Sequence, residues 1–129
     1  MKRHADFLGV LYLAWGAIFA LVGLAGLALA GGALAIARDG GPVSVSTDFA
    51  AGLTALTLGL IAVLALVFGS LHVWIGVVLR RYRPWGRLLA LGLAVINLVL
   101  FPFGTALGGY ACWVLLTEEG RALFVEPDG

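Results

Sequence analysis

Three long runs of uncharged, mostly apolar residues dominate the chain and predict its helices. Residues 7–37 and 49–79 are each 31 residues without a charged side chain, and residues 88–117 form a third run of 30. Because the hydrocarbon core of a bilayer is about 30 Å thick, an α-helix needs roughly 20 residues to cross it. The first two runs therefore predict one spanning helix each, near residues 7–32 and 49–79, with residues left over for tilt or for the connection.

The third run is interrupted by Pro102-Phe103-Gly104. Proline removes a backbone donor and clashes with the preceding turn, while glycine permits a sharp reversal. We expect a hairpin of two helices, over residues 85–101 and 104–118. The first of them has about 14 uncharged residues, or about 21 Å of helix, so a turn inside the bilayer would need protein to cover its polar backbone. One kinked helix is the alternative, and it would place the C-terminus on the opposite side.

The connections between the runs carry turn and capping signals. Gly31-Gly32 is where we expect the first helix to loosen, and Gly40-Gly41-Pro42 predicts the turn that follows. Thr47 or Asp48 is a suitable N-cap for the second helix. Pro84 fits the first turn of the third helix.

Together these elements predict an all-α integral membrane four-helix bundle, in which two long helices precede a short helical hairpin. We expect one domain over residues 1–129, with residues 118–129 as an amphipathic tail along the interface. Lys2-Arg3 before an apolar run also resembles a signal peptide. The run far exceeds the roughly 7–15 residues of a typical signal core, so we expect an uncleaved span.

The composition of the chain indicates that its surroundings are lipid and not water. The chain is 62% hydrophobic and 12% charged, whereas an average soluble domain is about 25% charged. A short soluble protein could not cover so much apolar surface, and the mean hydropathy of +1.08 agrees. We therefore expect a lipid bilayer around the chain and no nucleic-acid partner.

The charges predict an orientation. In a four-helix topology only Arg38 lies on one face, and seven basic residues share the other: Lys2, Arg3, Arg80, Arg81, Arg83, Arg87 and Arg121. The positive-inside rule then predicts a multi-pass protein of the cytoplasmic (inner) membrane with both termini in the cytoplasm. The aromatic residues expected at the same face are Trp74, Tyr82, Trp85 and Trp113. The arginines from Arg80 to Arg87 would also attract anionic lipid head groups, at about 1 kcal/mol each.

Small residues recur at helical spacing and predict close helix packing. The glycines concerned are Gly9, Gly16 and Gly23 in the first helix, Gly59, Gly69 and Gly76 in the second, and Gly104 and Gly108 in the fourth. Such stripes let helix backbones approach closely in lipid. They serve packing inside the bundle, or one of them faces another copy of the chain or a membrane-protein partner.

Few residues inside the runs offer chemistry. The absence of Asp, Glu, Lys and Arg argues against ion-coupled transport. His72 would lie about 12 Å below the cytoplasmic end of the second helix, where it could ligate haem, hold a quinone, carry a proton or hydrogen-bond a neighbouring helix. Asn97 would lie about 15 Å deep and would join helices, at about 0.6–2 kcal/mol, or line a permeation path.

The remaining residues give no sign of catalysis. Cys112 is a lone thiol among apolar neighbours, which leaves it inert. The sequence has no triad-like arrangement, no metal-ligand cluster and no phosphate-binding glycine loop before a basic helix. We expect no catalytic residue, metal or cofactor, and therefore no enzymatic activity.

The C-terminal half carries a resemblance. The segments concerned are Arg83 to Arg87, Phe101 to Gly108 with Tyr110, Trp113 to Leu116, and Glu119 to Phe124. Over roughly residues 80–124 the chain resembles a group of small bacterial four-helix membrane proteins of uncharacterised function, although Gly109 and Cys112 stand where larger apolar residues are expected. The resemblance implies the hairpin and a bacterial inner membrane, and it implies no activity.

Three functions remain. The sequence favours a non-enzymatic accessory or scaffolding component that acts through helix–helix contacts. The first alternative is a homo-oligomeric pore or small-molecule carrier. The second is a quinone- or haem-associated protein that uses His72.

Overall fold

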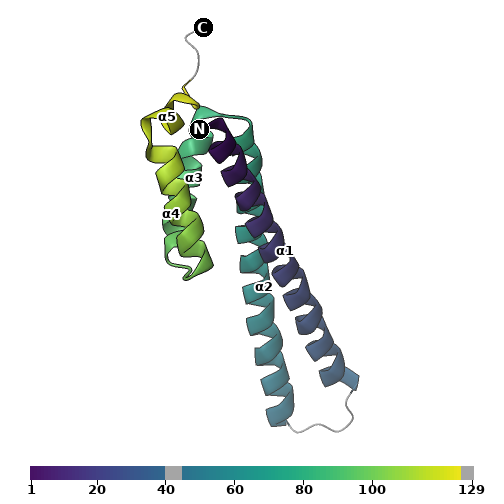
Figure 1. Cartoon of the computed structure of the whole chain (residues 1–129). Coiled ribbons are helices and arrows are strands. Elements are labelled where there is room, and N and C mark those ends of the chain that lie inside the picture. Colours follow the sequence, from purple (N-terminus) through teal and green to yellow (C-terminus); the bar gives the residue numbers. More distant parts are fainter. Residues whose placement is uncertain (40–44, 126–129) are drawn as a thin grey trace. The chain divides into compact units, whose positions relative to one another are not determined.

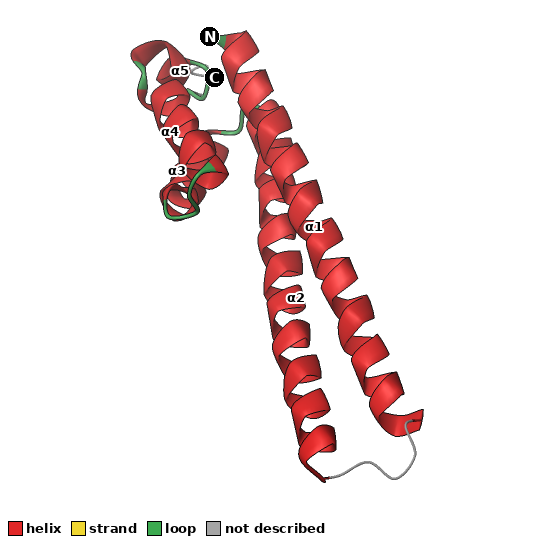
Figure 2. Cartoon of the chain, turned by 60° about the horizontal axis from the view of Figure 1, so that its bottom comes forward, coloured by secondary structure: helices red, strands yellow, loops and turns green. Residues whose placement is uncertain are grey.

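The computed structural model describes residues 1–39 and 45–125, and this part of the chain contains five α-helices and no strand (Figures 1 and 2). The helices are α1 (Lys2–Asp39), α2 (Val45–Arg80), α3 (Pro84–Leu98), α4 (Phe103–Leu116) and α5 (Glu118–Ala122). The all-α class is confirmed, with two long helices followed by a short hairpin. By length and composition, α1 and α2 are apolar enough to cross a membrane.

The two long helices begin and end at other residues than the sequence suggested. The helix α1 continues through Gly31-Gly32 to Asp39, so the loosening expected there is wrong. Each glycine costs about 1 kcal/mol in a helix, and the strong helix formers after them offset this. Since α2 begins at Val45, Thr47 and Asp48 lie in its first turn and do not precede it as caps. The turn expected at residues 40–42 lies outside the described residues.

The short helices begin where their local chemistry requires. Arg83 has extended backbone angles, φ −71° and ψ 132°, and Pro84 follows as the first residue of α3, as expected. Thr117 is also extended and ends α4. Its side chain accepts a hydrogen bond from the Gly120 amide at 3.3 Å, which caps the single turn of α5.

The chain forms two compact units, and each long helix contributes to both. The paired-helix unit is Ala17–Ser70; the hairpin unit is Met1–Gly16 together with the chain from Leu71 onward. The single domain expected from the sequence stays a prediction.

In the paired-helix unit, α1 and α2 lie side by side (Figure 1). Phe19 and Phe68 pack edge to face with ring centroids 4.9 Å apart. At Gly23 a Cβ would lie 2.9 Å from the carbonyl oxygen of Ala62, so only glycine permits this approach. Small residues at such positions let helix backbones approach closely in lipid.

In the hairpin unit, α3 and α4 pack against each other, and the start of α1 lies beside the end of α2 (Figures 1 and 2). A Cβ at Gly108 would lie 2.5 Å from the Ala94 carbonyl oxygen, and one at Gly76 would lie 2.8 Å from the Gly9 carbonyl oxygen. Glycine therefore brings backbone against backbone in both helix pairs.

The other stripe glycines divide into two groups. Gly104 is another close approach, since its Cβ would lie 2.6 Å from the Asn97 carbonyl oxygen. Gly16 and Gly69 are buried. Gly59 would meet no atom within 4 Å, so the described residues leave its side of α2 open.

Candidate functional site

The two polar side chains expected inside the membrane lie next to each other in the hairpin unit. The Nε2 atom of His72 on α2 lies 2.9 Å from Nδ2 and 3.1 Å from Oδ1 of Asn97 on α3, and both side chains are fully buried. With neutral His72 protonated on Nδ1, Nε2 accepts a hydrogen bond from the Asn97 amide; the other tautomer donates to Oδ1. The contact joins α2 to α3 in either case.

Tyr12 on α1 completes this buried polar cluster, which we define as Tyr12, His72 and Asn97. Its ring stacks on the imidazole of His72, with centroids 5.5 Å apart and 26° between the planes. Its hydroxyl donates to the carbonyl oxygen of Ala90 on α3 at 2.9 Å. The cluster thus links three helices. The sequence did not single out Tyr12, although a lone hydroxyl in the uncharged run of α1 was an available signal.

The geometry of the cluster limits what it can do chemically. All three side chains have no exposed surface. The imidazole is hydrogen-bonded on one edge and covered by the Tyr12 ring on one face. Binding a haem iron or a quinone through His72 would therefore require the cluster to open. As it stands, the arrangement holds helices together, because a polar group that lost its partner here would be costly.

The arginines assigned to topology and lipid head groups have different surroundings. Arg81 and Arg83 are exposed on the α2–α3 connection. Arg87 turns inward, and its Nε donates to the carbonyl oxygen of Leu115 at 3.0 Å, near the end of α4. A cation there complements the negative end of the helix dipole and fixes α3 to α4. Arg80 lies against α1, since a Cβ at Gly9 would meet its Cγ at 2.6 Å.

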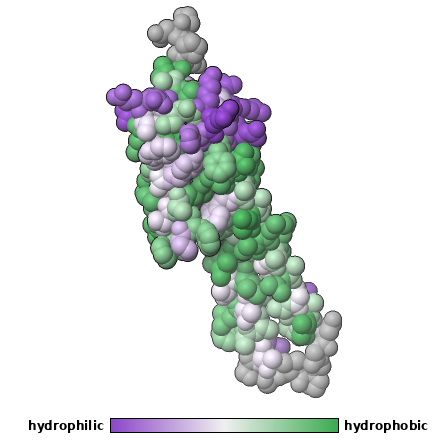
Figure 3. Space-filling model, in the orientation of Figure 1, coloured by the Kyte–Doolittle hydropathy of each residue, from purple (hydrophilic) through white to green (hydrophobic). Residues whose placement is uncertain are grey.

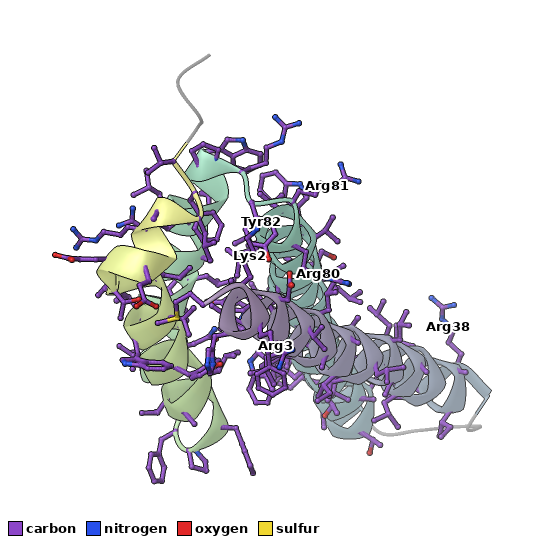
Figure 4. All side chains as sticks on the ribbon, turned by 45° about the horizontal axis from the view of Figure 1, so that its top comes forward. Lys2, Arg3, Arg38, Arg80, Arg81 and Tyr82 are labelled. Carbon is purple, nitrogen blue, oxygen red and sulfur yellow. The ribbon has the colours of Figure 1, made fainter. Side chains whose placement is uncertain are left out.

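Charged side chains gather at the end of the hairpin unit where α1 begins and α2 ends (Figures 3 and 4). Aromatic side chains surround this end. Trp74 and Trp85 pack with centroids 5.5 Å apart, as two of the residues expected to form an interfacial belt. His4 Nδ1 lies 3.0 Å from the Tyr110 hydroxyl, and its ring packs edge to face on Trp113. No sequence pattern predicted the pair of His4 and Tyr110, which are 106 residues apart.

Tyr82 links the α2–α3 connection to the start of α1 (Figure 4). Its φ of 51° is left-handed, a conformation common just after a helix but unfavourable for a residue with a Cβ. Its hydroxyl donates to Oδ1 of Asp6 at 2.8 Å. Partial burial first, then the hydrogen bond and charge of Asp6, raise the pKa of Tyr82 from 10.0 to about 12, while Arg80 opposes the rise.

The Asp6→Asn variant is expected to lower the pKa of Tyr82 toward 10, because the carboxylate that disfavours the phenolate is gone. Burial still contributes, so the return is partial. Since the folded pKa is the higher one, this contact stabilises the fold fully below pH 10, and the contribution is lost as the pH rises toward about 12. Phenolate absorbance during alkaline titration measures the shift, with Tyr82→Phe identifying the Tyr82 transition. An unchanged Tyr82 transition in Asp6→Asn would contradict the contact.

Comparison of the chain with protein-family models, with curated proteins and with solved structures finds no match. The candidate sites therefore rest on the geometry of this chain. Within residues 1–39 and 45–125, no group of three or more His, Cys, Asp or Glu side chains is placed to hold a metal ion.

Proposed function

We propose that this chain is a multi-pass integral protein of the cytoplasmic membrane that acts as a non-enzymatic accessory or scaffolding component through helix–helix contacts. The observation that carries the proposal is the exposed apolar surface of α1 and α2. Large side chains point outward along both helices, among them Leu21 (66% exposed), Ile36 (75%), Leu56 (69%) and Leu60 (61%) (Figure 3). In water this surface would cost roughly 25 cal/mol per Å², whereas acyl chains solvate it at no such cost.

The orientation follows from the charges along the sequence. At the end of α1, Arg38 is the only basic residue near the connection between the two long helices. The end of α2 and the α2–α3 connection carry Arg80, Arg81 and Arg83. The positive-inside rule then assigns the α2–α3 connection and both termini to the cytoplasm. The exposed Arg81 and Arg83 would lie among anionic head groups there.

Open small residues support a scaffolding role. Gly52 and Gly59 lie seven residues apart on α2, and a Cβ at either would meet no atom of residues 1–39 and 45–125 within 4 Å. Gly31 and Gly32 on α1 are open in the same way. Small residues on a lipid-facing helix allow a further helix to approach closely, and in lipid such packing takes the place of the hydrophobic drive.

The buried polar cluster also favours this function over a cofactor site. His72 is hydrogen-bonded to Asn97 and stacked on Tyr12, so its side chain is already used in holding the hairpin unit together. The uncharged runs contain no Asp, Glu, Lys or Arg, the residues that ion-coupled carriers usually need near the midplane.

Reconstitution tests the proposal. The purified chain is incorporated into liposomes, washed with alkaline carbonate and assayed for leakage of a trapped ion and a trapped small solute, and its mass is measured by native mass spectrometry. We expect the protein to stay with the liposomes and to leave their permeability unchanged from that of empty liposomes. Release by carbonate would contradict membrane integration. A ring-sized oligomer together with leakage would contradict the scaffolding function and favour a homo-oligomeric pore.

A further inference from the structure

The end of the hairpin unit at the α3–α4 turn is unusually apolar. Its side chains point outward: Val99 is 82% exposed, Phe101 is 85% exposed and Phe103 is 71% exposed. We call these three residues the hairpin tip. Residues 88–117, on both sides of the turn, contain no charged side chain. A loop that reached water or the lipid head groups would ordinarily be polar, because its backbone and side chains need solvation.

The hairpin is too short to cross a bilayer. The helix α3 has 15 residues and α4 has 14, so each is only about 22 Å long at about 1.5 Å per residue. The hydrocarbon core measures about 30 Å. Arg83 and Arg87 hold one end of α3, and Glu118 and Glu119 follow α4, so the charged end of the hairpin belongs at an interface. From there the tip ends inside the hydrocarbon, and any tilt shortens its reach further.

The turn also satisfies much of its own backbone, which a turn in lipid must do. The carbonyl oxygen of Leu98 accepts from the Thr105 hydroxyl at 2.8 Å, and that of Leu100 accepts from the Thr105 amide at 3.2 Å. The Val99 carbonyl accepts from the Phe101 amide at 3.1 Å. Pro102 has no amide hydrogen to satisfy, and its carbonyl accepts from the Ala106 amide at 3.2 Å. Thr105 thus replaces the water that an ordinary loop would use.

We infer that the α3–α4 hairpin is re-entrant: it enters and leaves the membrane at the cytoplasmic face, and its tip contacts acyl chains within the hydrocarbon core. The inference rests on the proposed membrane location and changes its topology, since α3 and α4 are then no longer spans. The occupant of the tip surface is lipid, because length, apolar exposure and internal hydrogen bonding all suit a medium without water.

Cysteine labelling tests the position of the tip. The background is Cys112→Ala, and the single-cysteine variants are Phe101→Cys at the tip, Asp48→Cys near the start of α2 and Glu118→Cys after α4. Each is treated with a membrane-impermeant maleimide from the outside of right-side-out vesicles and of inverted vesicles. We expect Asp48→Cys to react from the periplasmic side only, Glu118→Cys from the cytoplasmic side only, and Phe101→Cys from neither until the membrane is dissolved in detergent.

A nitroxide at position 101 distinguishes lipid from protein cover. In lipid, we expect frequent collisions with oxygen and rare collisions with a water-soluble nickel chelate, giving a higher oxygen-to-nickel ratio than at position 118. Low collision rates with both would mean that protein covers the tip, and frequent nickel collisions or periplasmic labelling would place it in water; each result overturns the inference. Should Phe101→Cys fail to fold, Val99→Cys takes its place.

The two control positions keep this inference separate from the proposed function. If Asp48→Cys and Glu118→Cys both react from the cytoplasmic side, or if the protein leaves the vesicles in carbonate, the proposed membrane topology of α2 fails. If both react from the periplasmic side, α3 and α4 cross the membrane as one helix, and the re-entrant hairpin fails. If those controls react as expected and the tip cysteine also reacts before detergent is added, the re-entrant hairpin alone fails.

Discussion

Gly108→Ala is expected to destabilise the fold by about 1–3 kcal/mol, in line with the usual cost of overpacking a close-packed site. The methyl group would lie 2.5 Å from the Ala94 carbonyl oxygen and 3.1 Å from the Leu98 nitrogen. Both are backbone atoms of α3, so no flexible side chain can move aside, and the two helices of the hairpin must separate. The Asn97 side chain on α3 would be displaced with them.

The neighbouring residue provides the matched control. Gly109 also lies inside α4, but a Cβ there would meet no atom within 4 Å among the residues that the structure describes. Gly109→Ala is therefore expected to stabilise the helix by up to about 1 kcal/mol, which is the difference in helix propensity between the two residues. Two identical substitutions at adjacent positions thus have opposite signs.

Unfolding of both variants in detergent micelles, followed by circular dichroism, measures this difference. Equal effects of the two substitutions would show that α3 and α4 do not pack as described. If Gly108→Ala cannot be purified, the two variants are compared by the fraction of each protein that remains monodisperse after extraction into detergent.

Asn97→Leu is expected to destabilise the fold by about 1–3 kcal/mol, because His72 loses a buried hydrogen-bond partner of similar size. His72→Leu likewise takes the hydrogen-bond partner His72 away from the buried Asn97 amide. The double variant is expected to cost less than the sum of the two single variants, by about 0.6–2 kcal/mol, since neither partner then remains unpaired.

Thr57→Val serves as the control for this cycle. Thr57 is exposed on α2, and its hydroxyl donates only within its own helix, to the Leu53 carbonyl at 2.8 Å. Its replacement should change the free energy of unfolding little. Strictly additive effects of His72→Leu and Asn97→Leu would contradict an energetic link between α2 and α3 through this pair. If both single variants keep the stability of the unchanged protein, the cluster does not stabilise the fold.

The hydropathy pattern was sufficient for the helices because it reflects each segment alone. Uncharged runs of this length predict long apolar helices in any tertiary arrangement, and Pro102 with Gly104 predicts a turn for local reasons. The helix ends were less predictable. Gly31-Gly32 did not loosen α1, and α2 begins at Val45, two residues before Thr47, because a local preference of about 1 kcal/mol is easily outweighed by neighbouring residues.

The stripe glycines also show which features the sequence could predict and which it could not. Spacing placed Gly23 and Gly59 on helix faces, but spacing cannot say which face has a neighbour. In the structure α2 packs against Gly23, whereas a Cβ at Gly59 would meet no atom of the described part of the chain within 4 Å. The same holds for the polar residues. Their positions within the uncharged runs suggested that His72 and Asn97 each contact a neighbouring helix, but not that they contact each other.

By itself, the sequence determined the helical class, the two long apolar helices and the hairpin turn, because these follow from hydropathy and from local backbone chemistry. Only the tertiary structure decided that Tyr12 joins His72 and Asn97, that Arg87 binds the Leu115 carbonyl, and that Thr105 closes the hairpin turn. All three contacts join residues of different helices, since Leu98 ends α3 and Thr105 lies in α4. Such pairings depend on which faces meet in space, which no single segment specifies.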